Sequence, residues 1–272
     1  MEVHAHTHTD DPDPSTSSGQ RGRKKFTHYL WEFFMLFLAV TLGFLVENKR
    51  EHIVEHKRVK EYAESMLNDL KEDTNQLHLL IGRYTYGANC VDSFVNLLAT
   101  QDVKKILSGK LYWFGLWGGF TNSFVSNDAT FQQMKSSGSL RYITNRELSK
   151  KISLYDWQIR KIESYMEKDL PIYTETRKTR SMIFDFRYNM LSNEIAQSLY
   201  QAMSSGVAFD RQRLDSFMKA NPPLLTYDKN ILNQYTEMCR SRSLRPLTQN
   251  LQIAFSLAEE LIADIQKEYN LK

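Results

Sequence analysis

Residues 29–50 of the chain are YLWEFFMLFLAVTLGFLVENKR, and this stretch decides what kind of protein the sequence encodes. No residue between Phe33 and Val46 is charged, and Glu32 lies just before this run. A helix of about 20 mainly apolar residues spans the roughly 30 Å hydrocarbon core of a bilayer, and this run is at the short end of that range. A buried helix of a soluble protein would carry a polar stripe, which the middle of the run lacks. A cleaved signal peptide fits poorly, because a long polar segment precedes the run. We therefore predict an uncleaved single-pass transmembrane anchor at 26–47.

Basic residues flank the predicted anchor on both sides, and their arrangement bears on its orientation. A compact cluster without interspersed acids precedes the anchor: Arg21, Arg23, Lys24 and Lys25. After the anchor, the basic residues alternate with acids such as Glu51 and Glu55. Cytoplasmic segments next to a membrane carry an excess of Lys and Arg. The pattern predicts a cytoplasmic N-terminus and an exported C-terminal domain, which is the periplasmic side of a bacterial inner membrane.

Residues 1–25 precede the anchor and lack apolar periodicity, which predicts a disordered cytoplasmic tail. This tail has alternating histidines, namely His4, His6 and His8, followed by Asp10, Asp11 and Asp13. Such a tract can chelate a divalent metal, but without a scaffold we expect a solvated tail. His52 and His56, four residues apart on one helical face, are a second candidate pair. No third ligand is evident, so we expect a solvated pair, and we predict no metal and no cofactor.

Residues 48–272 show the spacing of a helical domain. Apolar residues recur at alternating steps of four and three from Val59 to Leu98, with Asp73 and Gly87 as the exceptions. This seam predicts that the helix continues beyond the anchor and packs on partner helices with bundle or coiled-coil geometry. Further helices are predicted after Asp128, after Asn145, at 172–203, at 227–240 and at 247–269. Breaks are predicted near Gly138 and 221–223, and Pro171 predicts a kink or a restart. The predicted fold is all-α: one N-terminal transmembrane helix continuing into a long helix of an extramembrane helical bundle.

Residues 108–128 interrupt this periodicity with the sequence SGKLYWFGLWGGFTNSFVSND. The segment mixes Gly-containing turn signals with many aromatic residues. A loop this apolar either covers the core or forms an interaction surface. We expect it to cap the core of the bundle.

Two segments resemble a bacterial family of single-pass membrane proteins with a conserved domain of unknown function. Residues 29–51 are similar to the family's N-terminal helix, in which a Glu opens an apolar run that ends near an Asn; Glu32 and Asn48 match here. Residues 130–156 are similar to its Lys-Ser-Ser-Gly pattern, through Lys135, Ser136, Ser137, Gly138, Leu140, Ile143, Asn145, Leu148 and Tyr155. The resemblance covers about fifty residues, and it implies a topology and a domain type but no activity.

No sequence feature indicates catalysis. No nucleophile elbow, phosphate-binding loop, dinucleotide fingerprint or zinc motif occurs, and no histidine follows His78. The net charge of +3 does not suggest binding to nucleic acid. The two cysteines, Cys90 and Cys239, fall in predicted helices; oxidation could pair them in an exported domain, but we expect inert buried thiols. The protein is therefore not expected to be an enzyme.

Two non-enzymatic functions are compatible with the sequence. One is an interaction or scaffold protein of the bacterial envelope, and the other is a four-helix-type receptor that senses a ligand and signals across the membrane. A receptor needs an output module, which the short tail does not offer, so we favour the first. The expected partners are the lipid bilayer and either a second copy or another membrane protein.

The anchor offers a candidate face for contact with such a partner helix. At steps of four, three and four, one helical face carries Glu32, Leu36, Ala39 and Gly43. Ala39 and Gly43 form a small-xxx-small pair that lets two helices approach closely. The Glu32 carboxyl group either reaches Lys24, Lys25 or lipid headgroups, or forms a hydrogen bond with a second helix. Both alternatives are open from the sequence.

Overall fold

The computed structural model describes the backbone of residues 21–271 and the side chains of Phe26 and residues 28–271. The described part is almost entirely helical, with no strand and a single isolated bridge between Phe184 and Leu224. The α-helices are α1 (Arg21–Thr100), α2 (Ser108–Leu116), α3 (Ala129–Ser136), α4 (Arg146–Ile183), α5 (Phe186–Ser205), α6 (Arg211–Lys219), α7 (Lys229–Ser241) and α8 (Leu244–Tyr269). Short 3-10 turns are η1 (Val103–Lys105), η2 (Trp117–Gly119) and η3 (Ser139–Tyr142). The predicted all-α fold is confirmed.

The chain divides into two compact units, Met1–Lys57 and Arg58–Lys272, and helix α1 belongs to both. In the first unit, the large apolar side chains from Phe26 to Val46 are exposed. The early part of α1 is long and apolar enough to cross a bilayer. Helix α1 begins at Arg21 and so includes the last residues of the tail predicted for 1–25. The histidine tract at residues 4–8 lies outside the described residues.

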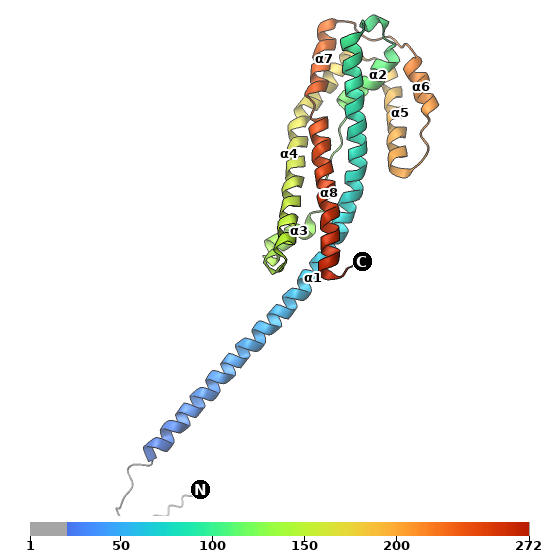
Figure 1. The fold of residues 1–272 in the computed structure, drawn as a ribbon. Coiled ribbons are helices and arrows are strands. Elements are labelled where there is room, and N and C mark those ends of the chain that lie inside the picture. Colours follow the sequence, from blue (N-terminus) through green and yellow to red (C-terminus); the bar gives the residue numbers. More distant parts are fainter. Residues whose placement is uncertain (1–20, 272) are drawn as a thin grey trace, which may run out of the picture. The chain divides into compact units, whose positions relative to one another are not determined.

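The second unit is a helical bundle in which α4 packs along both α7 and α8 (Figure 1). The part of α1 that follows Arg58 runs beside α8, with Asp92 paired to Arg245 and the His78 ring 6.0 Å from the Phe255 ring. Helices α5 and α6 pack on the short helix α2. A single continuous core therefore forms between α1, α2, α4, α7 and α8.

The apolar seam predicted along α1 faces this core. From Val59 to Phe94, every position of the seam that has an apolar side chain is buried. The two exceptions have separate explanations. A Cβ atom on Gly87 would lie 3.3 Å from the Phe120 ring, so the absence of a side chain leaves room for that ring. Asp73 is buried and hydrogen-bonded, as described below.

Residues 108–116 were predicted as part of a capping loop, and that prediction is wrong for their secondary structure: they form helix α2. The predicted burial is correct, since most of α2 is buried. A helix that is buried on nearly all sides has no polar stripe, which is why the sequence shows no helical period here. Gly109 allows the backbone of residues 217–220 to approach, because a Cβ there would lie 2.1 Å from the Phe217 carbonyl oxygen and 2.8 Å from that of Ala220.

The ends of several helices follow local signals in the sequence. Asn145 caps α4 by accepting a hydrogen bond from the Leu148 N–H at 3.2 Å. Gly138 ends the α3 segment with a φ of 71°, a left-handed conformation that glycine adopts without strain. Helix α4 continues through Pro171, so, of the predicted kink or restart at that residue, the restart does not occur.

Candidate functional site

The most informative site in the bundle begins with the buried carboxylate of Asp73 on α1, which is 1% exposed. It accepts hydrogen bonds from the Ser126 hydroxyl at 2.5 Å, the Asn127 backbone N–H at 2.8 Å and the Tyr155 hydroxyl at 2.7 Å. The Asn127 side-chain amide adds a fourth bond at 3.2 Å. A buried carboxylate is costly unless its oxygens are hydrogen-bonded, and here both oxygens are. Asp73 therefore joins α1, α4 and the 120–128 segment.

A cavity of about 220 Å³ lies next to this network. Its apolar wall consists of Met66, Leu70, Phe131, Ile152, Tyr155, Ile159 and Leu261. Its polar lining consists of Asp69, Ser126, Asn127, Asp128, Gln132, Asp156, Arg160 and Glu163. These residues come from α1, the 120–128 segment, α3, α4 and α8, so the tertiary fold assembles the site from five parts of the chain.

The ionisable groups of the cavity lining are four carboxylates, one arginine and the Tyr155 phenol. The Tyr155 hydroxyl donates to Asp73, and burial, followed by the neighbouring carboxylate, raises the pKa of Tyr155 well above its usual range. The phenol therefore stays protonated and is a poor base. The cavity lining contains no histidine and no cysteine. Among residues 21–271, no group of three potential metal-ligating side chains comes together.

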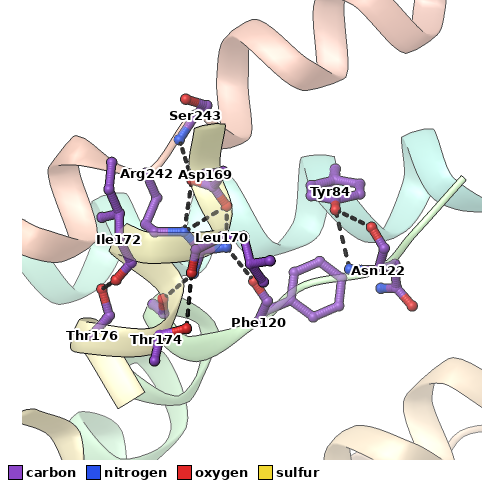
Figure 2. Close-up of polar contacts among 11 residues, drawn as sticks. Tyr84, Phe120, Asn122, Asp169, Leu170, Ile172, Thr174, Thr176, Arg242 and Ser243 are labelled. Atoms are coloured by element: carbon purple, nitrogen blue, oxygen red, sulfur yellow. Dashed lines mark hydrogen bonds and ion pairs between the residues drawn. The ribbon is translucent and has the colours of Figure 1, made fainter. Parts of the chain in front are cut away.

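A second buried polar cluster fixes the start of the segment that covers the cavity, and Figure 2 shows it. The Arg242 guanidinium donates to both oxygens of Asp169 at 2.9 Å, and further N–H groups donate to the carbonyls of Gly118 at 2.5 Å and Phe120 at 2.7 Å. The Ser243 N–H donates to Asp169 at 3.1 Å. A buried ion pair is tolerated when its remaining donors and acceptors are satisfied, as they are here. The cluster ties η2 to α4 and to the start of α8.

Between these two clusters, Tyr84 of α1 holds the middle of the same segment (Figure 2). Its hydroxyl donates to the Asn122 carbonyl at 2.5 Å and accepts from the Asn122 N–H at 3.1 Å. Arg242, Tyr84 and Asp73 thus hold residues 118–127 at successive points. We call residues 120–128 the clamped segment. It has no regular secondary structure over most of its length, and buried side chains replace the backbone hydrogen bonds that a helix would supply.

The predicted helix-association residues all lie on exposed positions of α1 in the first unit. Glu32, Leu36, Ala39 and Gly43 share one face because the helix is continuous there. A Cβ on Gly43 would meet nothing within 4 Å. The structure adds a neighbour that sequence reasoning missed: the Glu32 carboxylate lies 3.2 Å from His28 Nε2, one turn earlier. Whether this face meets another helix stays a prediction.

The histidine pair and the two cysteines singled out in the sequence lie in different parts of the described structure. His52 and His56 lie side by side, with ring centroids 4.4 Å apart, on the exposed surface of α1. Two imidazoles alone leave a metal ion with incomplete protein coordination. Cys90 and Cys239 are both buried and free, which agrees with the expected inert thiols. Burial raises the pKa of each thiol to about 12.

Sequence reasoning missed a group of exposed apolar residues near the junction of α4 and α5 and in the 224–227 loop, which is hydrogen-bonded to that junction. It consists of Met182, Phe186, Met190, Leu225 and Tyr227, all exposed. The Leu225 N–H donates to the Ile183 carbonyl at 2.8 Å, and the Phe184–Leu224 bridge adjoins this bond, so the two chain segments are held together. We call these five residues the apolar end surface. No periodicity signals it, because two of its residues lie in a loop.

Sequence reasoning also did not identify the cavity. The signal that could have found it was the single acid in the apolar seam, Asp73, which marks a buried polar contact.

The chain was compared with known proteins in three ways: a scan against protein-family models, a search of curated proteins and a search of solved structures each found no match. The family resemblance of residues 29–51 and 130–156 therefore stays a prediction.

Proposed function

We propose that the chain is a membrane-anchored helical interaction protein of the bacterial envelope, without catalytic activity. In this proposal, residues 26–47 tether it to the inner membrane, and the bundle, on the periplasmic side, docks another envelope protein. The apolar end surface is the observation that carries the proposal.

The apolar end surface has the chemistry of a docking site. Phe186 is 74% exposed although it is a large aromatic residue, and Met182 and Met190 lie near it in sequence on α4 and α5. Contiguous exposed apolar groups with a polar surround mark interaction sites in proteins. Aromatic residues and Met are enriched in protein interfaces, and the flexible Met side chain adapts to partners. The backbone beneath the surface is held by the Leu225–Ile183 hydrogen bond, so the surface is preorganised.

Site-specific photo-crosslinking in native membranes tests this proposal. A photo-reactive phenylalanine analogue placed at Phe186 should give a discrete protein adduct, which mass spectrometry identifies. Ile253 on α8 is the matched control, because it is also an exposed apolar residue but lies outside the apolar end surface. Phe186→Asp together with Met190→Asp should abolish the adduct formed from a probe at Leu225. Adducts with lipid alone, or equal yields from both probe positions, would contradict docking at this surface.

The cavity favours a second candidate function, the ligand-sensing receptor. A preformed cavity with an apolar wall and a few convergent polar groups is the usual form of a small-molecule site. In this candidate, ligand binding between α1, α4 and α8 would alter the packing of α1, the helix that also contains the anchor. Ligand-dependent change in crosslinking between two copies of α1 would support it, and unchanged crosslinking at saturating ligand would contradict it.

A further inference from the structure

We infer that the cavity between α1, α3, α4 and α8 binds a small organic cation: a protonated amine attached to an apolar body. This inference is separate from docking at the apolar end surface, and it supplies a ligand class for the receptor candidate. Three properties of the cavity lead to it, namely its size, its apolar wall and the charges of its polar lining.

The size and wall of the cavity set the body of the ligand. An engineered cavity of about 150 Å³ lined by apolar residues holds benzene. At about 220 Å³, this cavity has room for a benzene-sized group with a short chain, but it is smaller than the sites that take drug-sized ligands, roughly 300–1,000 Å³. The inner wall includes the apolar side chains of Leu70, Ile152, Ile159 and Leu261, which are buried and favour a hydrocarbon group.

The charges of the lining set the head group. Four carboxylates line the cavity: Asp69, Asp128, Asp156 and Glu163. Among the described residues that line it, Arg160 is the single cation, and it is already paired with Asp156. The lining is therefore net negative, which favours a cation and disfavours an anion.

Two of these carboxylates retain free acceptor capacity. Asp69 uses one oxygen to accept the Thr130 hydroxyl, and within the described part of the chain its other oxygen has no hydrogen-bond partner. Glu163 likewise has no ion-pair or hydrogen-bond partner among those residues. Asp73, by contrast, already accepts four hydrogen bonds. An ammonium group has three donors and no acceptor, so Asp69 and Glu163 are the groups that would receive it.

Isothermal titration calorimetry on the full chain in zwitterionic phosphatidylcholine nanodiscs tests the inference, with empty nanodiscs as the blank. The probes are phenethylamine, 3-phenylpropanoate and 2-phenylethanol, which share a body and differ in head-group charge. We expect the amine to bind, the alcohol to bind at least tenfold more weakly, and the carboxylate not to bind. Equal binding of amine and carboxylate, or binding of no probe, would overturn the inference.

Two variants and one surface control locate the binding. Asp69→Asn should weaken amine binding at least fivefold and leave the alcohol unchanged, while Asp215→Asn, which removes the same charge from the exposed surface of α6, should leave both unchanged. Ile159→Trp fills the cavity and should abolish binding of every probe, provided that circular dichroism shows the helical content retained. If Asp69→Asn and Asp215→Asn have the same effect on the amine, the cation does not bind at Asp69 and the inference fails. Because these readouts do not involve Phe186, their failure is distinguishable from failure of the docking proposal.

Discussion

At the scale of single residues, Asp73 illustrates how one polar side chain in an apolar seam organises its surroundings. Its carboxylate satisfies donors from Tyr155 on α4 and from Ser126 and Asn127 in the clamped segment. Removing it leaves those buried donors without an acceptor, and unsatisfied buried donors cost more than the lost bonds themselves. Asp73 is therefore a structural residue, and its partners Ser126, Asn127 and Tyr155 line the cavity.

Replacing Asp73 tests this role. We expect Asp73→Ala to lower the free energy of unfolding by about 2–4 kcal/mol, because hydrogen bonds to a charged acceptor contribute about 1.5–3 kcal/mol each and are not additive. Tyr155→Phe removes one of these bonds and should cost about 1.5 kcal/mol. Urea unfolding of the full chain in detergent, followed by circular dichroism, gives both values. The matched control is Glu72→Ala on the adjacent, exposed position of α1; an equal loss in that variant would contradict the role assigned to Asp73.

The two thiols give a prediction about alkaline pH. Burial raises the pKa of Cys90 and Cys239 from 9.0 to about 12, so the unfolded chain loses these protons first. Stability contributed by the thiols should be fully present below pH 9 and lost as the pH rises from 9 to 12, by roughly 1.4 kcal/mol per thiol at pH 10. Urea midpoints between pH 8 and 10.5 measure this slope. A Cys90→Ala, Cys239→Ala double variant should show a shallower fall; an identical slope would exclude the thiols as its source.

At the scale of secondary-structure elements, the anchor and the clamped segment differ in what holds them. The apolar part of α1 predicted as the anchor satisfies its backbone hydrogen bonds within the helix, which is what crossing a bilayer requires. The clamped segment relies on side chains of Arg242, Tyr84 and Asp73. Surface side chains of the anchor part can therefore be replaced without loss of the helix. The conformation of the clamped segment, by contrast, depends on its tertiary contacts.

The anchor face yields a prediction at this scale. Gly43→Ile should strongly reduce association of the anchor, because a bulky side chain keeps two helices apart at the Ala39–Gly43 pair. Glu32→Gln should reduce it about twofold to threefold, since an interhelical hydrogen bond contributes on average about 0.6 kcal/mol. Val40→Ile, on another face, should have no effect. A reporter assay of helix association with residues 26–50 measures these effects.

The surroundings of Gly43 bear on how the Gly43→Ile result is interpreted. Apart from the local backbone of the helix, no atom lies within 4 Å of a Cβ placed on Gly43, so the position has open space for a larger side chain. If Gly43→Ile associates as strongly as the unsubstituted anchor, the anchor is a simple tether, and the Glu32–His28 pair serves only to keep the carboxylate near the membrane surface.

At the scale of the whole molecule, the orientation of the anchor determines which compartment the bundle occupies. The basic cluster from Arg21 to Lys25 predicts that the N-terminus is cytoplasmic. Alkaline phosphatase fused after Lys272 should then be active in a bacterial host, and green fluorescent protein at the same position should be dark. A fluorescent, phosphatase-inactive pair of fusions would place the bundle in the cytoplasm. Replacing the four basic residues with Gln should weaken the orientation bias.

Much of the fold follows from local features of the sequence. The uncharged run after Glu32, the apolar seam from Val59 to Phe94 and the cap at Asn145 each depend on neighbours a few residues away, so the sequence was sufficient to predict a membrane-length helix, a buried helical face and a helix start. The helical class follows from the same features, because each helix satisfies its own backbone hydrogen bonds.

The tertiary structure alone decided three things: that residues 108–116 are a helix, that Asp73 is satisfied, and that Asp69, Asp128 and Glu163 line one cavity. Burial on nearly all sides removes the amphipathic period of α2, so no sequence pattern distinguishes it from an apolar loop. These three residues lie on α1, at the end of the clamped segment and on α4, far apart in the chain. Their proximity depends on how those helices pack, and packing is a property of many side chains at once rather than of any short segment.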